Sequence, residues 1–483
     1  MFFAWQKFDS MLFNSEGFFF FFVVVFVLYY LLRHPRRWVL LLVASYYFYA
    51  QWNAAYLALI LFSTLVDFWA GKKMAALPDP KARRPYLYLS LISNLGLLFT
   101  FKYVNFLGDS INELIGGEIP FIPHLELLLP VGISFYTFQT LSYTLEIYYG
   151  RLQPSTHLGK FGLFVSFFPQ LVAGPIERSG HLLPQFERKI TFDYERVAHG
   201  LHLVLWGLFK KVVVADRLAL FVNEVYGHPD QYAGLSIILA TLGFAFQIYC
   251  DFSGYSDMAI GLARMLGFDL MQNFRQPYLA TSLADYWRRW HISLSTWFRD
   301  YVYIPLGGNR VVKWRWYYNL FLTFLVSGLW HGAAWTFVIW GAIHGLILVV
   351  EQMTGISGKK GKRFTWGVRL FRMGYTFMVV CVAWIFFRAE SVSDAFALIG
   401  KMWEPTQEPL SWRMMGNQPL ELMFALAGVL FVYCADVFVE LREKNQDIRH
   451  YPLGLRWIWY MVLLSGIAFL GVFEDQAFIY FQF

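Results

Sequence analysis

The sequence predicts an all-α, polytopic integral membrane protein, with roughly 11–13 membrane helices plus re-entrant and interfacial helices around a central tunnel. Hydrophobic residues make up 57% of the 483 positions and aromatic residues 20%. Only 15% of the residues are charged, whereas a soluble domain typically carries about 25%. The net charge of +7 is explained by basic loops that orient membrane helices, so it does not indicate nucleic-acid binding.

Apolar segments recur along the whole chain, and a membrane-spanning helix needs ~20 apolar residues. They lie at 17–32, 38–50, 54–70, 86–107, 125–149, 161–174, 201–225, 233–250, 252–267, 317–350, 367–388, 420–441 and 455–473. Basic residues follow the first segment at Arg33, Arg36 and Arg37, the reverse of a cleavable signal peptide. We therefore expect it to remain as the first span, whether translation starts at Met1 or Met11.

The charges of the loops predict the orientation of the chain. Loops 34–37 and 71–85 are basic, whereas 108–126 contains acidic residues and no Lys or Arg. Near the other end, 357–363 and the loop around Arg442 and Arg449 are basic. Because positive loops stay in the cytoplasm, we expect loops 71–85 and 357–363 to be cytoplasmic and both termini to be extracytoplasmic.

We expect one membrane-embedded domain over 1–483, with N-terminal spans at 1–160, a tunnel and catalytic core at 161–350, and C-terminal spans at 351–483. The middle does not divide into regular spans, because Pro169, Gly174 and Pro175 would break a helix. Irregular backbone at membrane depth must be covered by protein or line a water-filled cavity. Residues 161–316 are therefore predicted to form re-entrant and interfacial helices.

The uncharged run 317–350 contains His331, flanked by Gly328 and Gly332. Ionisable groups at membrane depth are costly and are usually functional. Burial disfavours the imidazolium, so the ring should be neutral and able to accept a proton. The glycines would let a substrate approach, and Trp330 and Trp335 could wall the pocket. A core histidine bonded to a carbonyl is the alternative; we favour a catalytic base.

Three other ionisable residues in apolar segments are weaker candidates. On one continuous helix His344 would lie roughly 140° from His331, so we expect it to be a packing residue unless the helix breaks at Gly341. Asp251 and Asp257 would diverge by about 120°, which argues against a carboxylate pair. We expect them to cap helices next to Ser253 and Gly254.

The segment 285–315 is basic and Trp-rich. Asp285 and Arg289 have the spacing of a helical ion pair. Two interpretations of Arg288 and Arg299 stay open: they anchor an interfacial helix, or they bind a phosphorylated donor while His291 lines the path to His331. The full cationic collar consists of Arg288, Arg289, Arg299, Arg310, Lys313 and Arg315.

Several known catalytic motifs do not occur in the sequence. It has no GxSxG, GxxxxGK[ST] or HExxH motif, which excludes serine hydrolases of that type, P-loop pumps and zincins. Cys250, Cys381 and Cys434 lie in apolar stretches without a CxxC pair. We therefore expect no metal site.

Five strings together resemble the membrane-bound O-acyltransferase family, and within it the bacterial alginate O-acetyltransferase branch. They are LLPVGISFYTFQTLSYTLEIY, FFPQLVAGPIER, QIYCDFSGYSDMAIGLARMLGF, YWRRWHISLSTWFRDYVYIPLGGN and SGLWHGAAWTFVIWGAIHG, between Leu128 and Gly345. The family's membrane histidine maps onto His331, and its other recurrent polar position onto His291.

This resemblance implies a multi-pass protein of a bacterial inner membrane, in contact with membrane lipid. It implies an acetyl group taken from a cytoplasmic thioester such as acetyl-CoA, without a tightly bound cofactor. The acetyl group would pass to hydroxyls of an exported polysaccharide such as alginate, directly or through a periplasmic or extracellular acetyltransferase. We expect Arg288, Arg299, Trp290, Trp330, Trp335 and Asn319 to bind substrate. Asn319, Ser327 and the Trp N–H groups are candidates to polarise the thioester oxygen.

Other acceptors and one other class of protein remain open at this point. The resemblance also covers O-acetylation of peptidoglycan or another exopolysaccharide, and D-alanyl transfer to teichoic acid. A transporter of acyl groups or polymer would have buried polar residues as well. Transporters commonly show an internal repeat with paired broken helices, and we see none.

Overall fold

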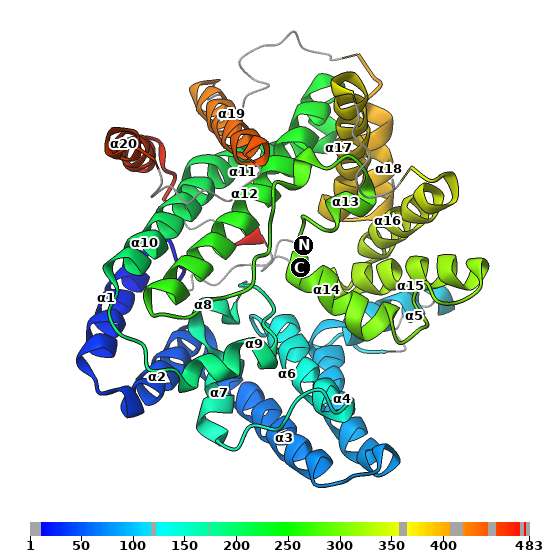
Figure 1. The fold of residues 1–483 in the computed structure, drawn as a ribbon. Helices are drawn as coiled ribbons and strands as arrows, with labels where there is room; N and C mark the ends of the chain where they lie inside the picture. The colour runs from blue at the N-terminus through cyan, green and yellow to red at the C-terminus, as the bar shows by residue number, and fades with distance from the viewer. Residues whose placement is uncertain are drawn as a thin grey trace. The chain divides into compact units, whose positions relative to one another are not determined.

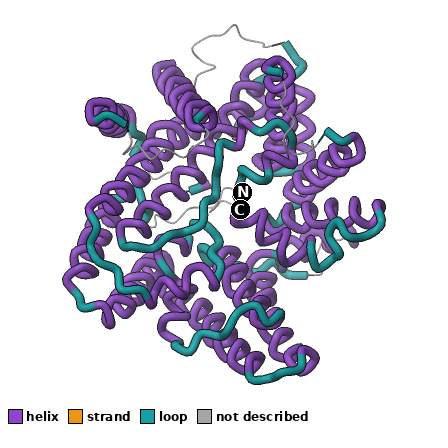
Figure 2. Tube along the Cα trace, in the orientation of Figure 1, coloured by secondary structure: helices purple, strands orange, loops and turns teal. Residues whose placement is uncertain are grey.

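The structure is a computed structural model that describes residues 11–116, 122–172, 174–356, 365–405, 419–442, 451–473 and 478–479. Over these ranges the chain forms helices and loops and no β-strand (Figures 1 and 2), which confirms the all-α prediction. The chain divides into two compact units. Unit 1 comprises Met1–Val204 with Met258–Met271, and unit 2 comprises Leu205–Asp257 with Gln272–Phe483.

Unit 1 is built from helices of the N-terminal half. They are α1 (Glu16–Leu31), α2 (His34–Asn53), η1 (Ala54–Tyr56), α3 (Leu57–Ala75), α4 (Pro80–Lys102), α5 (Val104–Ile115), α6 (Ile133–Tyr148), α7 (Leu158–Ser166), α8 (Phe168–Leu171), α9 (Ser179–Leu182), η2 (Leu183–Glu187) and most of α10 (Tyr194–Leu208). Local capping sets several starts: the Ser15 side chain accepts from the Phe18 N–H, and the Asp79 side chain from the Lys81 N–H.

A buried carboxyl joins three helices of unit 1. The Asp67 carboxyl, on α3, accepts from Ser90 Oγ at 2.6 Å and from Asn94 Nδ2 at 2.9 and 3.0 Å. Both donors lie on α4, and Ser90 also contacts Thr144 Oγ1 of α6 at 3.0 Å. Neutral donors thus satisfy a polar group that would otherwise be costly to bury.

Unit 2 contains the remaining helices. They are η3 (Phe209–Ala215), α11 (Asp216–Gly227), η4 (Pro229–Gln231), α12 (Leu235–Met265, of which Leu235–Asp257 belong here), η5 (Pro277–Leu279), α13 (Leu283–Tyr286), α14 (Ile292–Phe298), η6 (Arg299–Tyr303), α15 (Lys313–His331), α16 (Trp335–Thr354), α17 (Trp366–Arg388), α18 (Val392–Lys401), α19 (Pro419–Leu441) and α20 (Leu453–Leu470). The short helices η5, α13, α14 and η6 fall in the predicted irregular middle.

Within the described residues, six helical stretches are long and apolar enough to cross a membrane, or up to seven if the bent pair α4 and α5 counts as one span. This confirms the multi-pass membrane class. The number of such stretches is lower than the roughly 11–13 membrane helices expected. One reason is that 34–75, which contains both α2 and α3, counts as a single stretch of 42 residues. Another is that α1 has only 16 residues.

The run 317–350 is not one helix, as our estimate of the His331–His344 angle assumed. The chain leaves the helix after His331, because Gly332 (φ −158°) and Ala334 (φ −151°) are extended. α16 then packs back against α15. A Cβ on Gly328 would collide with the carbonyl oxygen of Phe337, and one on Gly341 with that of Phe324. Glycine at both contact points allows this close helical hairpin.

The two predicted segments 233–250 and 252–267 form one helix, α12, of 31 residues. Asp251 and Asp257 therefore lie inside a helix, and the prediction that they cap helices is wrong. Their charges are balanced instead by lysines of the π-helix η3. Lys211 Nζ lies 2.8 Å from Asp251, and Lys210 Nζ lies 2.7 Å from Asp257. Because each carboxylate has its own cation, the helix continues through both.

Candidate active site

His331 is the last residue of α15 and is almost fully buried in unit 2, with 4% of its surface exposed. Three aromatic rings surround its imidazole. The ring centroids of Trp330, Trp340 and Phe387 lie 5.0, 4.9 and 5.4 Å from that of His331. These rings come from α15, α16 and α17, so the hairpin turn after His331 is what places the imidazole among them.

His291 precedes α14 and is completely buried. Its backbone is left-handed (φ 41°, ψ 55°), which is uncommon for a residue with a side chain. The Nδ1 atom lies 3.3 Å from Asn273 Oδ1, and the ring meets Phe252 edge-on at 4.6 Å. Burial lowers the pKa of His291 to about 3, so its ring is neutral at physiological pH.

One indole connects the two predicted catalytic histidines. The Trp330 ring lies 6.3 Å from the His291 ring and 5.0 Å from the His331 ring, between centroids. His291 and His331 are 40 positions apart in the sequence. The structure therefore brings both to the same tryptophan.

His344 also reaches this cluster, because α15 and α16 are separate helices. Its ring lies 4.7 Å from Trp340, the same indole that contacts His331. The Nδ1 atom of His344 accepts from the Trp287 indole N–H at 3.3 Å. This contact agrees with the expectation that His344 is a hydrogen-bonded packing residue. The expectation that His344 lies on a different side from His331 is wrong, because both rings contact Trp340.

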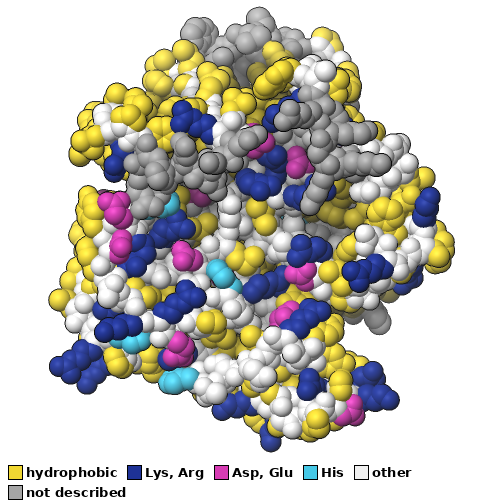
Figure 3. Space-filling model, in the orientation of Figure 1, with side chains coloured by type: hydrophobic (Ala, Val, Ile, Leu, Met, Phe, Trp, Pro, Cys, Tyr) yellow, Lys and Arg dark blue, Asp and Glu magenta, His cyan; other side chains and the backbone are white. Residues whose placement is uncertain are grey.

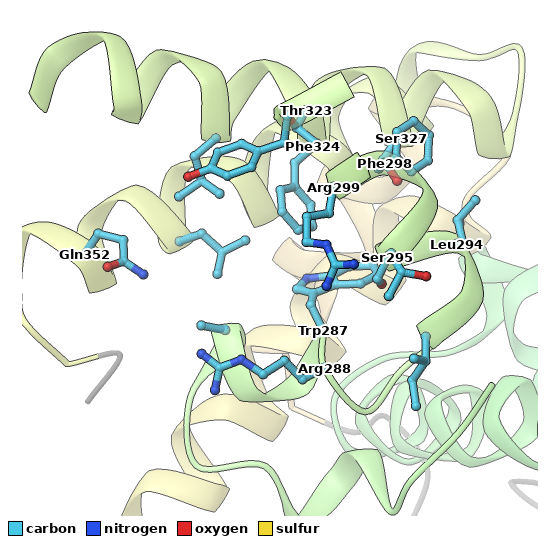
Figure 4. Close-up of a pocket in the computed structure, with 16 residues that line it drawn as sticks. Trp287, Arg288, Leu294, Ser295, Phe298, Arg299, Thr323, Phe324, Ser327 and Gln352 are labelled. Carbon is cyan, nitrogen blue, oxygen red and sulfur yellow. The ribbon is translucent and has the colours of Figure 1, made fainter. Parts of the chain in front are cut away.

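A cavity of about 510 Å³ lies in unit 2 beside these residues. It is lined by Ala284, Trp287, Arg288, Ile292, Leu294, Ser295, Thr296, Phe298, Arg299, Tyr303, Leu320, Thr323, Phe324, Ser327, Leu348 and Gln352. Figure 4 shows the Arg288 and Arg299 side chains extending into the same space, with Ser295 close to Arg299 and Gln352 across it. Ser327 lies four residues before His331 on α15, so the cavity and His331 share a helix.

The predicted cationic collar separates into residues with different partners. Arg288 is exposed, and no carboxylate of the described residues forms an ion pair with it. Arg299 pairs with the adjacent Asp300 at 2.8 Å. Arg289 is held by Asp285 at 3.2 Å and Glu440 at 2.9 Å, so the predicted helical pair with Asp285 is present. Only Arg288 and Arg299 of the collar line the cavity.

The rest of the collar lies outside that lining. Arg310 and Lys313 are exposed, and the Arg315 guanidinium lies over the Tyr318 ring at 5.2 Å. Basic residues are scattered over the face in Figure 3. The collar therefore does not form a single anion site, since two of its six residues line the cavity and the other four do not.

Four of the expected substrate-binding residues are not in the cavity lining, namely Trp290, Trp330, Trp335 and Asn319. Trp290 is buried against Trp384, with ring centroids 5.2 Å apart. Trp335 begins α16 and is 54% exposed. The Asn319 amide donates to the carbonyls of Leu306 and Gly308, at 3.1 Å each, and so braces the turn before α15.

Two residues that contact the histidines are not among those predicted from the sequence. Asn273 contacts His291, and Trp340 contacts both His331 and His344. Asn273 lies next to Gln272 and shortly before Arg275 and Gln276, so no local pattern distinguishes it from the other polar residues of this loop. Trp340 is one of 19 tryptophans, and no local pattern distinguishes it.

Comparison with known proteins places these residues in context. The profile of the membrane-bound O-acyltransferase family matches residues 152–356, a range that contains the three histidines and the whole cavity lining. A probable alginate O-acetylase AlgI of Pseudomonas putida is 39% identical over 459 residues, covering 90% of this chain and 92% of that protein.

Two further relatives are named for other acceptors. A peptidoglycan O-acetyltransferase of Helicobacter pylori is 34% identical over 477 residues, covering 90% of this chain and 89% of that protein. A teichoic acid D-alanyltransferase of Bacillus subtilis is 27% identical over 287 residues, covering 56% of this chain and 71% of that protein. Similarity thus extends over nearly the whole chain for the two O-acetyl relatives and over about half for the third.

Proposed function

The chain belongs to the membrane-bound O-acyltransferase family, and from that premise we propose that it moves an acetyl group from a cytoplasmic thioester to hydroxyls of an exported polysaccharide. The observation that carries this proposal is the position of His331. A buried imidazole in an aromatic box lies one helical turn from a cavity that holds two guanidinium groups. Such a site can activate a hydroxyl next to a bound anionic donor.

The acceptor we propose is alginate or a chemically similar exopolysaccharide. The support is that the Pseudomonas putida relative, named as a probable alginate O-acetylase, is 39% identical and is covered over 92% of its length. Peptidoglycan and teichoic acid are the acceptors in the names of the more distant relatives. Transfer to the polymer is direct or passes through a periplasmic or extracellular acetyltransferase partner.

We place the donor at the cavity lined by Arg288 and Arg299. Acetyl-CoA carries phosphates, and guanidinium groups bind phosphate oxygens through paired, charge-assisted hydrogen bonds. Ser295 and Thr296 line the same cavity, but their hydroxyls already donate to the carbonyls of Trp290 and Ser293. The two arginines are therefore the hydrogen-bond donors to phosphate in this proposal. A donor held there would direct its acyl end along α15 toward His331.

The chemistry we assign to His331 is general-base catalysis. A thioester is already activated, so the enzyme must align the acceptor hydroxyl with the acyl carbon and remove one proton. The hydroxyl oxygen forms the new ester bond while its proton passes to a ring nitrogen of His331. The carbon–sulfur bond then breaks, and the thiolate leaves with a proton returned by the imidazolium.

The Trp340 indole is our candidate for the group that stabilises the thioester oxygen. Its N–H is buried and has no hydrogen-bond acceptor among the described residues, and its ring contacts His331. The Trp384 N–H is likewise buried without an acceptor there, so the ring contact with His331 is what favours Trp340. A donor of this kind, aimed at the developing oxyanion, is a common catalytic device.

Orientation in the bacterial inner membrane belongs to the same proposal. We place the loop at 71–85 in the cytoplasm and both termini outside it; the loop 357–363, residues 1–10 and residues 480–483 lie outside the described residues. The single domain with its core at 161–350 and the central tunnel stay predictions. Reporter fusions after residues 80, 116 and 360 test the orientation, and a cytoplasmic signal at residue 116 would overturn it.

The transfer itself is tested in membrane vesicles that contain the protein and radiolabelled acetyl-CoA. Separate reactions receive alginate, peptidoglycan or teichoic acid, with and without an extracytoplasmic acetyltransferase partner. We expect alkali-labile label on alginate. Label on peptidoglycan or teichoic acid instead would replace the acceptor, and unlabelled polymer in every reaction would contradict the acetyl-transfer proposal.

A further inference from the structure

Asn273 is a fully buried amide in the loop between α12 and η5, and it is hydrogen-bonded at both ends. Its Nδ2 donates to Ser256 Oγ at 3.2 Å. Its Oδ1 accepts from Ser293 Oγ at 2.6 Å and from the Ser293 backbone N–H at 3.4 Å. The same Oδ1 lies 3.3 Å from His291 Nδ1.

These contacts determine which nitrogen of His291 carries the proton. A backbone N–H is always a donor, so the Asn273 atom that faces the Ser293 N–H must be the oxygen. An oxygen of this kind can only accept, so His291 Nδ1, which faces it, must donate. The neutral imidazole has one N–H, and Nε2 is therefore the nitrogen with the lone pair.

The same residue also holds the backbone of His291. The left-handed conformation at His291 (φ 41°) is one that side chains rarely adopt, and it must be maintained by surrounding contacts. The backbone carbonyl of Asn273 accepts from the Ile292 N–H at 2.9 Å. Asn273 thus bonds to three consecutive residues, 291 to 293, and fixes both the ring and the chain that carries it.

We propose that Asn273 is a positioning residue that holds His291 as the Nδ1–H tautomer, so that Nε2 acts as a hydrogen-bond acceptor for a second hydroxyl of the acceptor sugar, next to the attacking one. This assignment rests on the acetyl-transfer function proposed above. It gives the histidines different tasks: His331 takes the proton of the attacking hydroxyl, and His291 accepts a hydrogen bond from a neighbouring hydroxyl and so orients the sugar. It also excludes His291 as a hydrogen-bond donor to the thioester oxygen.

The surroundings of His291 support a fixed, neutral ring. Phe252 of α12 and Trp330 of α15 pack against it. The titratable residues next to these contacts are Asp251, which pairs with Lys211, and His331. The low pKa that burial imposes on His291 agrees with a ring that keeps one proton, on Nδ1.

The tautomer can be measured without any assay of activity. The full-length protein, labelled with ¹⁵N-histidine and placed in lipid nanodiscs, gives ¹⁵N chemical shifts that separate protonated from unprotonated ring nitrogens. Comparison with His291→Gln assigns the His291 signals among the 11 histidines. We expect a protonated Nδ1 and an unprotonated Nε2. An Nε2–H tautomer in the wild-type protein would overturn the assignment.

Two variants at one position then separate positioning from packing. Asn273→Asp keeps an oxygen that accepts from Nδ1, whereas Asn273→Leu has a similar volume and no acceptor. We expect Asn273→Asp to keep the Nδ1–H tautomer and to act within about tenfold of wild type. We expect Asn273→Leu to lose the tautomer preference and about 10²-fold in kcat.

Equal activity of Asn273→Leu and Asn273→Asp, at equal protein levels, would contradict the proposal. Ser256→Ala is the matched control, because it removes only the partner of Nδ2 and should leave the tautomer unchanged. Failure of the acetyl-transfer function would look different. Wild-type vesicles would then transfer no acetyl group, while the NMR measurement would still show which ring nitrogen of His291 carries the proton.

Discussion

Unit 2 contains two buried polar clusters that are built in opposite ways. Around His331 and His291 the imidazoles contact the rings of Trp330, Trp340 and Phe252, and no charged group is paired with them among these contacts. Around Lys210 and Lys211 the neighbours are carboxylates. Lys211 alone has Asp216 and Asp251 at 2.8 Å each.

The difference between the clusters suggests different roles. The paired charges of the lysine cluster hold helices together, whereas the histidines are the groups that we propose to act in catalysis. In the lysine cluster each cation has a carboxylate within ion-pair distance, and Asp251 also accepts the Ile479 N–H at 2.7 Å. Such a network joins η3, α12 and the chain near the C-terminus, and its charged groups are bound to one another. In the histidine cluster the imidazoles contact aromatic rings and, at His291, an uncharged amide. We therefore expect mutations in the first cluster to unfold the protein and mutations in the second to stop catalysis.

The largest expected effect on folding comes from Lys211→Met. It leaves Asp216 and Asp251 buried without their shared cation, and breaking a buried ion pair typically costs about 3–5 kcal/mol. We expect a lower melting temperature in detergent and reduced accumulation in membranes. The control is Lys81→Met, because Lys81 is exposed. A melting temperature equal to that of the control would show that the lysine cluster does not stabilise the fold.

The largest expected effect of an aromatic substitution on catalysis comes from Trp340→Phe. The change keeps a ring in contact with His331 and removes only the indole N–H. Loss of an oxyanion-stabilising donor typically lowers kcat by about 10²-fold or more. Trp384→Phe is a matched control, since Trp384 is another buried indole of this aromatic region, 6.0 Å from Trp340 between centroids. Similar rates for the two variants would remove Trp340 from the oxyanion role.

A smaller effect is expected at the cavity. Arg288→Glu or Arg299→Glu should raise the apparent KM for the acetyl donor by about tenfold, with less change for the polymer, because each loses a charge-assisted contact to phosphate. Lys313→Glu is the control, as Lys313 is exposed and lies outside the cavity lining. An unchanged donor KM in both arginine variants would make these residues membrane-surface anchors.

The smallest effect is expected from His344→Ala. It removes the hydrogen bond to Trp287, which lies at the cavity wall, and a single neutral hydrogen bond contributes about 1 kcal/mol. We expect a decrease of a few-fold in transfer rate. A loss as large as that of the His331 variants would instead place His344 in the chemistry.

The helical membrane class could be predicted from the sequence, because it depends on local composition, and three candidate site residues could be proposed in the same way. His331 stood out as an ionisable residue in an uncharged run, and Arg288 and Arg299 by their position before it. The break after His331 could not be predicted, because it depends on the close packing of Gly328 against Gly341 between two helices. That break is also why His344 reaches the cluster.

The roles of Asp251 and Asn273 escaped the sequence for the same reason. The neighbours of Asp251 in the sequence, Ser253 and Gly254, favour helix capping. Its ion-pair partner in the structure is Lys211, 40 positions earlier. Asn273 acts on His291 across 18 positions and a loop. Contacts between distant segments decide whether a buried polar residue balances charge or orients a reactive group, and a local pattern does not contain them.

The role of His331 is tested most directly by the acetylation rate of His331→Gln, with polymer-bound acetate released by mild alkali and normalised to membrane protein level. Glutamine keeps a hydrogen-bonding group but cannot accept a proton. Loss of a general base typically costs about 10²–10⁴-fold, so we expect His331→Gln and His331→Ala to be nearly inactive at normal protein levels, with His291→Ala intermediate. Substantial acetylation by His331→Gln at normal levels would contradict the general-base role and leave His331 as a packing residue.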